Sequence, residues 1–135
     1  MRVLVLVKAT EETERGAMPN KEMMDKMGEF NERLIKAGVM LAADGLHPTS
    51  KGKRVRFDGE QRKVIDGPFA ETKELLAGFW MWNVNSMEEA VDWLKQAPFD
   101  GGAEVEIRPI FAPEDFAPEV RERRKRFYEK MAAEG

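Results

Sequence analysis

The spacing of apolar residues predicts strand, helix and strand in the first third of the chain. Residues 2–8, RVLVLVK, are apolar at nearly every position, as expected for an inner strand covered on both faces. A helix is expected from about residue 20 to residue 36, because apolar residues recur there at spacings of three and four. These positions are Met23, Met27, Phe30, Leu34 and Ala37. Gly38 ends the helix, and residues 39–44 form the second predicted strand.

The next segment, residues 53–66 (KRVRFDGEQRKVID), predicts a β-hairpin. The pair Asp58-Gly59 separates two alternating runs, and such a pair readily adopts the positive φ angles of a tight hairpin turn. Val55 and Phe57 alternate with two arginines in the first run. We therefore expect one face of the hairpin to be buried and the other to be solvated.

The second half of the chain repeats the pattern of strand, helix and strand. Residues 75–84 are predicted to form a long apolar strand. Ser86 can then cap a helix, with Glu89 completing a capping box, and Pro98 helps to end that helix. The inner face of the helix is predicted to consist of Ala90, Val91, Leu94 and Ala97. A last strand is expected over residues 103–111, where apolar and charged residues alternate.

These elements predict an α+β fold. Without the hairpin, their order is strand, helix, strand, strand, helix, strand, which is the βαββαβ order of ferredoxin-like domains, whose helices cover one side of an antiparallel sheet. The other side then needs cover, so we expect a homodimer in which the sheets of two chains face each other.

The C-terminal residues 112–135 are expected to lie outside the main domain of residues 1–111. Phe116 lies between two prolines, which predicts an extended arm with one aromatic anchor, followed by a helix from about Pro118. We expect this arm and helix to help close the dimer interface.

Composition narrows the classes of function. The 135 residues suit one domain, and 22 basic against 25 acidic residues argue against direct binding to nucleic acid. The absence of cysteine excludes disulfides and fits a reducing compartment. Residues 3–7 are too short for a signal peptide, and no later run approaches a membrane span, so we expect a cytoplasmic protein with no membrane association.

The candidate acid–base residues are His47, Asp66 and Glu71. Histidine exchanges protons readily near neutral pH, and an aspartate such as Asp66 or Asp44 could orient its imidazole. The alternative is that His47 is an ordinary surface or packing residue. Glu71 is a candidate base or ligand clamp, with ion pairing that holds the loop as the structural alternative.

The segment Asp66-Gly67-Pro68-Phe69 has two interpretations. Turn chemistry accounts for all four residues, because the aspartate accepts backbone hydrogen bonds, the glycine takes a difficult dihedral angle, the proline fixes the next one and the phenylalanine anchors the loop. The alternative is the mouth of a pocket, with Lys73 close by as a contact for an anion.

Three further residues are candidates for ligand binding. Phe69 and Trp80 are expected to line the pocket, although Trp80 shares a face with Trp82 that equally suits core packing. Arg108 could bind a ligand carboxylate or an acid of the loop. With one histidine and no cysteine we expect no metal site, and nothing in the sequence calls for an organic cofactor.

The motif DGPFAETKE and the order of elements resemble the YCII-related family, specifically its DGPF branch. The resemblance covers residues 1 to about 111 and includes GVMLAADGLHP, VIDGPFAETKELLAGFW, EEAVDWL and EVEIRPI. It implies a ferredoxin-like fold, a homodimer of the dimeric α+β barrel type and a pocket between the sheet and the loops. Other members carry a histidine and an aspartate proposed as an acid–base pair, at places that hold Met27 and Ala97 here.

Two functions follow as hypotheses. The first is a homodimeric protein with a small-molecule pocket beside the Asp66–Phe69 loop, with proton-transfer chemistry of the lyase or isomerase kind if it is an enzyme. The second is a non-catalytic sensing or protein-interaction module linked to transcription, because genes of the family often lie beside those of extracytoplasmic-function sigma factors.

Overall fold

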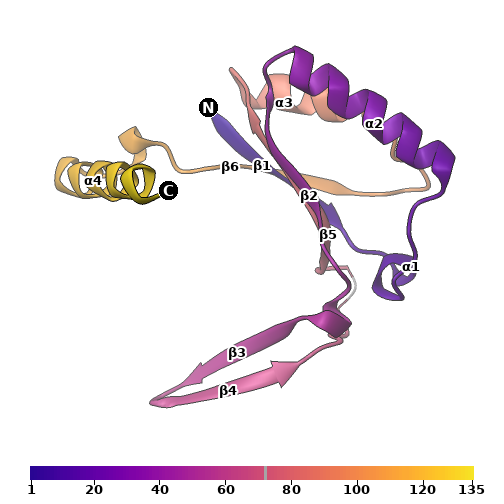
Figure 1. Ribbon diagram of the computed structural model, residues 1–135, viewed down its shortest axis with the longest axis horizontal. Coiled ribbons are helices and arrows are strands. Elements are labelled where there is room, and N and C mark those ends of the chain that lie inside the picture. Colours follow the sequence, from indigo (N-terminus) through magenta and orange to yellow (C-terminus); the bar gives the residue numbers. More distant parts are fainter. Residues whose placement is uncertain (72) are drawn as a thin grey trace.

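The computed structural model describes residues 1–71 and 73–135 and shows an α+β fold (Figure 1). The strands are β1 (Arg2–Lys8), β2 (Met40–Gly45), β3 (Lys53–Asp58), β4 (Gln61–Asp66), β5 (Leu76–Asn83) and β6 (Val105–Pro109). The helices are α1 (Glu11–Glu14), α2 (Lys21–Lys36), α3 (Met87–Leu94) and α4 (Pro118–Glu134), with short 3₁₀ turns η1 (Thr49–Lys51) and η2 (Pro113–Asp115). The predicted α+β class is confirmed, and the structure adds the short helix α1 between β1 and α2, where a loop was predicted.

Four strands form one antiparallel sheet in the order β2-β5-β1-β6. Strand β1 is central as predicted, with Val5 opposite Trp80 on β5 and Ile107 on β6. The hairpin strands β3 and β4 pair only with each other among the described residues.

Helices α2 and α3 cover one face of this sheet and form the core with it (Figure 1). Asn20 starts α2, because its side-chain oxygen accepts a hydrogen bond from the Met23 N–H at 2.8 Å. Gly38 ends the helix with a φ of 73°. The ring of Phe30 from α2 lies 5.8 Å from that of Trp80 in an edge-to-face contact. Other fully buried members of the core are Val3, Val5, Leu34, Trp82 and Ala90.

The opposite face of the sheet is also apolar. Side chains alternate across a strand, so Leu4 and Leu6 of β1 point away from the helices, with Met81 and Phe79 of β5 directly opposite them. These four side chains form what we call the open face, and each is half-buried. Strand β1 is therefore apolar on both sides as the sequence shows, but helices cover only one of them.

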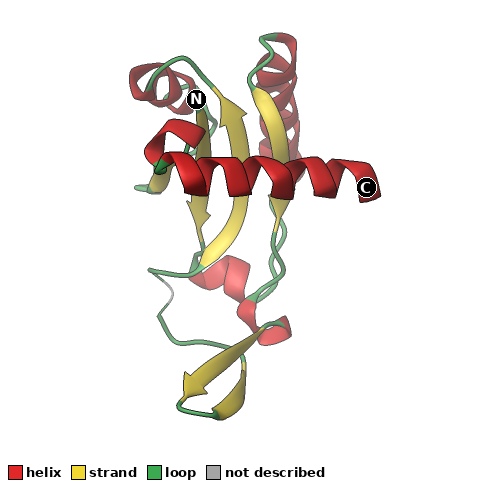
Figure 2. Cartoon of the chain, turned by 90° about the vertical axis from the view of Figure 1, so that its left-hand side faces the viewer, coloured by secondary structure: helices red, strands yellow, loops and turns green. Residues whose placement is uncertain are grey.

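Helix α4 lies on the open-face side and crosses in front of the sheet (Figure 2). Its apolar side chains are not buried by this position, since Phe127 is 58% and Met131 54% exposed. The predicted start at Pro118 is confirmed. In the parts of the chain that the structure describes, no helix is both long and apolar enough to cross a membrane.

The hairpin forms where the sequence predicts it, but its predicted buried face is exposed. The turn contains Gly59 with a φ of 60°, as tight hairpin turns require. Val55, Phe57 and Val64 are 49%, 71% and 63% exposed. The prediction of a buried face is thus wrong for the single chain, because the hairpin projects away from the sheet and no described layer lies against it (Figure 1).

Helix α3 confirms part of the predicted capping. The Ser86 hydroxyl accepts from the Glu89 N–H at 3.1 Å, while the Glu89 carboxylate accepts from the N–H of Asn85 at 2.6 Å. The helix ends at Leu94, short of Pro98. Because it is so short, it leaves Val91 38% exposed above strand β6.

Replacement of Phe30 by alanine should lower the free energy of unfolding by about 3–5 kcal/mol, because the ring is fully buried against two tryptophans. Ile35→Ala on the same helix is the control, since Ile35 is 62% exposed and its loss should cost about 0.5 kcal/mol or less. Urea unfolding followed by tryptophan fluorescence measures both. Equal losses for the two variants would contradict this core.

Candidate functional site

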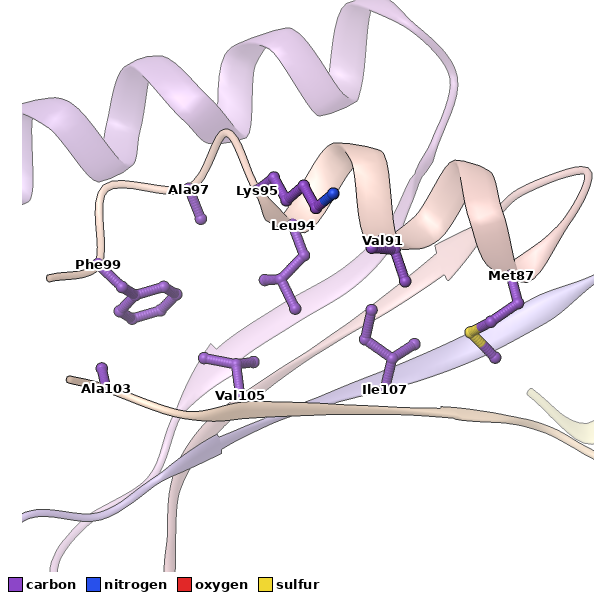
Figure 3. A pocket seen from close by; sticks show the side chains of 9 residues that line it. All are labelled: Met87, Val91, Leu94, Lys95, Ala97, Phe99, Ala103, Val105 and Ile107. Atoms are coloured by element: carbon purple, nitrogen blue, oxygen red, sulfur yellow. The ribbon is translucent and has the colours of Figure 1, made fainter.

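A groove of about 520 Å³ lies between α3 and β6 (Figure 3). Its walls are apolar, with Val91 and Leu94 on the helix side and Val105 and Ile107 on the strand side. Lys95 is the charged residue at its edge. None of the predicted site residues lines the groove, so it is distinct from the predicted pocket beside the Asp66–Phe69 loop.

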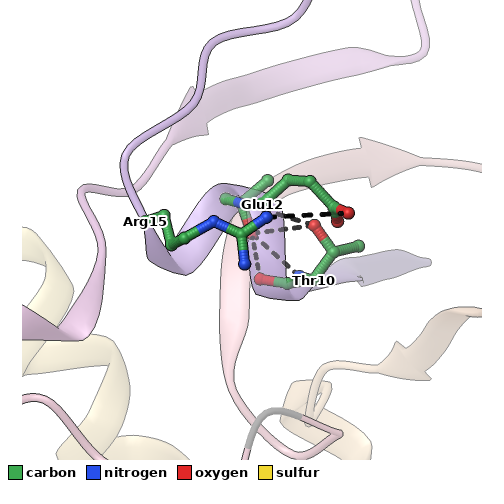
Figure 4. A network of polar contacts seen from close by, with 4 residues as sticks. Thr10, Glu12 and Arg15 are labelled. Carbon is green, nitrogen blue, oxygen red and sulfur yellow. Dashed lines mark hydrogen bonds and ion pairs between the residues drawn. The ribbon is translucent and has the colours of Figure 1, made fainter.

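The loop itself is held in place by helix α1. The helix is capped reciprocally, because the Thr10 hydroxyl accepts from the Thr13 N–H at 3.1 Å and the Thr13 hydroxyl oxygen accepts from the Thr10 N–H at 2.8 Å (Figure 4). The pKa of the Glu12 carboxyl is lowered, mainly by its own backbone N–H, then by the Thr10 hydroxyl and by the positive charge of Arg15. These contacts fix the last residue of the helix, Glu14.

Glu14 begins a chain of hydrogen bonds that reaches the loop. Its carboxylate accepts from the Thr49 N–H at 3.0 Å and from the Thr49 hydroxyl. The same hydroxyl oxygen accepts from the Phe69 N–H at 3.0 Å. Hydrogen bonds to a charged carboxylate are among the stronger ones in proteins, and this one is partly shielded from water. We call this chain, Glu14–Thr49–Phe69, the relay.

Neither Glu14 nor Thr49 was predicted from the sequence to belong to the site. They lie 35 residues apart, and Thr49 lies 20 residues from Phe69, so no local spacing connects them. The capping pattern of residues 10–13 was the available signal, because it marks a short helix whose end is held in place.

Gly67 makes the closest approach in the loop. A Cβ atom at this position would lie 1.8 Å from the carbonyl oxygen of Thr49. The Gly67 N–H also donates to the carbonyl oxygen of Gly52 at 3.1 Å. The sequence predicted a glycine with a difficult dihedral angle, but Gly67 has no positive φ. The glycine is required by the lack of space and not by its backbone conformation.

The acidic residues of the predicted site are engaged in ion pairs at the base of the hairpin. Asp66 Oδ1 lies 2.5 Å from Lys53 Nζ, and Glu71 Oε2 lies 3.7 Å from Arg54 Nη2. The Arg54 guanidinium also lies 3.8 Å from the centre of the Phe69 ring. All these charged groups are exposed, so each ion pair contributes little to stability. Together they hold the loop against the hairpin.

His47 and Lys73 lie next to this assembly without joining it. His47 is exposed and stands two residues before Thr49, in the segment that Leu46 fixes by donating its N–H to the Ala77 carbonyl at 2.8 Å. Lys73 is exposed in a turn after the loop. Among the described residues, neither side chain has a hydrogen bond or an ion pair. Both therefore remain open to a ligand.

Trp80 and Arg108 are not brought to the loop. Trp80 is 5% exposed in the helix-covered core, where its Nε1–H donates to Asn31 Oδ1 at 2.9 Å. Arg108 is opposite Leu4 on the sheet, and its exposed Nε lies 3.8 Å from the Glu106 carboxylate. Trp80 is thus placed as a core residue, and Arg108 at the rim of the open face.

The loop and the residues around it hold the hairpin to the sheet, and we call this set of contacts the clip. Within the described chain these residues bring together no group of three or more potential metal ligands, and the Thr49 hydroxyl beside the Glu14 carboxylate belongs to the relay. The structure therefore defines a small α+β protein whose sheet is covered on one face and whose hairpin is clipped to it by the relay.

Comparison with known proteins identifies the family. A family model described as the YCII-related domain matches residues 1–114, and the chain belongs to this family. The chain is also similar to an uncharacterised protein of Rhizobium meliloti (strain 1021), with 30% identity over 98 residues. That match covers 70% of this chain and 79% of the other protein. The family predicted from sequence is confirmed.

The substitution Gly67→Ala should lower the free energy of unfolding by about 1–3 kcal/mol, because the added Cβ forces the loop away from Thr49. Gly28→Ala is the control. Gly28 lies inside α2 with nothing within 4 Å of an added Cβ, so alanine there should stabilise the protein by about 0.5–1 kcal/mol. Urea unfolding gives both values, and a neutral effect at residue 67 would contradict the close approach.

Proposed function

We propose that this protein is a homodimer of ferredoxin-like, dimeric α+β barrel type that binds a small molecule beside the Asp66–Phe69 loop. The observation that carries the proposal is the open face, where Leu4, Leu6, Phe79 and Met81 lack a covering layer. The order of the four strands and the two helices on one face support the ferredoxin-like arrangement.

A second copy is the cover that suits the open face. The centre of the face is apolar, and charged residues flank it in the next positions of the register, namely Asp44 opposite Phe79 and Glu106 opposite Leu6. An apolar centre with a charged rim is the usual composition of a protein interface. Two twofold-related sheets pack face to face at a spacing of about 10 Å, which buries both apolar centres at once.

The ligand site is proposed at the junction of loop and hairpin, where it becomes enclosed when a second chain arrives. In this proposal Phe69 supplies an apolar wall, and His47, Asp66, Glu71 and Lys73, which are all exposed, supply the polar groups. In one chain these groups face solvent, whereas binding sites are concave and enclose most of the ligand. A negatively charged small molecule suits the exposed cationic side chain of Lys73.

The proposed role of the site is to bind a ligand, and catalysis there is a secondary part of the proposal. Asp66 and Glu71 already pair with Lys53 and Arg54, which leaves His47 as the group best placed for proton transfer. If the protein is an enzyme, transfer of a proton in a lyase or isomerase reaction suits these residues without an organic cofactor.

The second candidate function is a non-catalytic sensing or interaction module linked to regulation of transcription. It is favoured by the contacts of the loop, because the relay, the ion pairs and the Arg54–Phe69 contact account for the loop as a structural clip. Under this proposal the surface of the dimer carries the function.

Light scattering during size-exclusion chromatography should give a mass about twice the 15.4 kDa of one chain. Leu6→Glu should produce a folded monomer, because it places a charge at the centre of the open face. Ile35→Glu is the matched control, since it makes the same kind of change on the outer surface of α2 and should leave the dimer intact. A wild-type monomer at high concentration would overturn the homodimer.

A thermal-shift screen with anionic metabolites should find a compound that raises Tm of the wild-type protein. His47→Asn and Glu71→Gln should each abolish most of this shift while leaving the unliganded Tm nearly unchanged, because both side chains are exposed. Glu60→Gln in the hairpin turn is the control and should keep the shift. If no compound raises Tm and a protein co-purifies with the chain, the interaction module is favoured instead.

A further inference from the structure

We propose that the hairpin β3–β4 is a docking arm that lies on the body of the second copy, an inference that rests on the homodimer proposed above. The hairpin is more than a connection between β2 and β5. It has one largely apolar face and one basic face, and beyond the contacts of Lys53 and Arg54 at its base neither face packs on a described part of its own chain.

The apolar face shows that something covers the hairpin. Val55 lies directly opposite Val64, so the two side chains form a cross-strand pair on one face, and Phe57 extends the same face. All three are exposed, Phe57 by 71%. A two-stranded ribbon is marginal in water without a layer against its apolar face. Since no described part of the same chain supplies that layer, another molecule does.

Arg54 on the other face pairs with Glu71 at the base of the hairpin, but the centre of this face carries like charges. Arg56 and Lys63 are directly opposite each other, an arrangement that destabilises an isolated pair of strands. Neither forms an ion pair within the described part of the chain. Residues 53–66 contain five basic and three acidic residues, a net charge of +2. The hairpin is therefore suited to an acidic surface.

The net charge differs between the two projecting segments, which are the hairpin and helix α4, and the rest of the chain, which we call the body. Helix α4, residues 118–134, also has a net charge of +2, from six basic and four acidic residues. The remaining residues form the body and contain 11 basic and 18 acidic residues, a net charge of −7. An acidic body repels nucleic acid but attracts a basic arm. A second copy of this chain thus offers each arm a surface of opposite charge.

The position of the hairpin agrees with this partner. The hairpin and α4 both project to the side of the sheet that α2 and α3 leave uncovered (Figures 1 and 2). When a second copy covers the open face, its body enters the space beside both projections. The base of the hairpin is fixed by the Gly67–Gly52 hydrogen bond and the relay, so the arm is held in its projecting direction before the partner arrives.

The double variant Phe57→Ser/Val64→Ser tests the arm. It should raise the Kd of the dimer about tenfold or more, measured by sedimentation equilibrium, because the apolar contact with the second copy is lost. Gln61→Ser is the control, because Gln61 lies on the other face of the same strand and is uncharged, and it should change Kd less than about twofold. The urea midpoint of each variant shows that the body remains folded.

A cross-link identifies the surface that the arm meets. The chain has no cysteine, so Glu60→Cys allows one benzophenone label at the hairpin turn. Irradiation of a mixture of ¹⁵N-labelled and unlabelled protein should yield links between chains, from residue 60 to the body of the other copy. Cross-links found only within one chain would overturn the proposal that the hairpin docks on the second copy.

The outcomes separate the two proposals. If Leu6→Glu dissociates the dimer while Phe57→Ser/Val64→Ser leaves Kd within about twofold of wild type, the homodimer stands and the docking arm is overturned. If the wild-type chain is monomeric at high concentration, the homodimer fails and the arm fails with it. A large increase in Kd together with links between chains supports both.

Discussion

The alternation of side chains along β1 and β5 is the constraint on which the rest of the structure depends. Val3 and Val5 point into the core under α2 and α3, so Leu4 and Leu6, which alternate with them, necessarily point the other way. The sheet is therefore apolar on both faces, while α2 and α3 cover only one of them. The proposed homodimer rests on this second apolar face of the central strand.

The relay adds a second constraint, which connects the sheet to the hairpin. An exposed hairpin on a flexible connection would move freely relative to the sheet, so its surfaces would have no fixed position from which to contact a partner. Here Glu14 holds Thr49, and Thr49 holds the backbone of Phe69, while Gly67 fits against a carbonyl oxygen where no side chain has room. These contacts lie at the base of the hairpin, so a small rotation there would become a large displacement at Gly59. Local packing in the clip therefore determines where the arm lies.

The sequence predicted the elements well because each depends on neighbours within one strand or one helical turn. The 3.6-residue period around Phe30 and the turn at Gly59 are signals of this kind, and both are confirmed. The exposure of the hairpin in the single chain could not be predicted from the sequence. The alternation of apolar and polar residues shows that one face of the hairpin needs cover, but it does not show which layer provides that cover. For the same reason, Trp80 was an open choice between core and pocket until its position beneath α2 was known.

The site was the least predictable part, because the relay depends on contacts between segments 20 and 35 residues apart. Turn chemistry predicted the residue types of the Asp66–Phe69 loop. At Gly67, however, glycine is needed because a side chain has no room there, and not because of the backbone dihedral angle.

The helices of this chain lack the acid–base pair that the family resemblance suggested. Met27 and Ala97, at the places where relatives are expected to carry an acid–base pair, pack against the core in this chain. Neither apolar side chain can serve as an acid or a base. At the junction of loop and hairpin, the Arg54 guanidinium lies against the Phe69 ring and also pairs with Glu71. The hairpin projects from this junction, so a ligand that changed the ion pairs of Arg54 or Lys53 would act on the base of the hairpin. The proposed binding at the loop and the proposed pairing of two chains would then be coupled through the same few contacts.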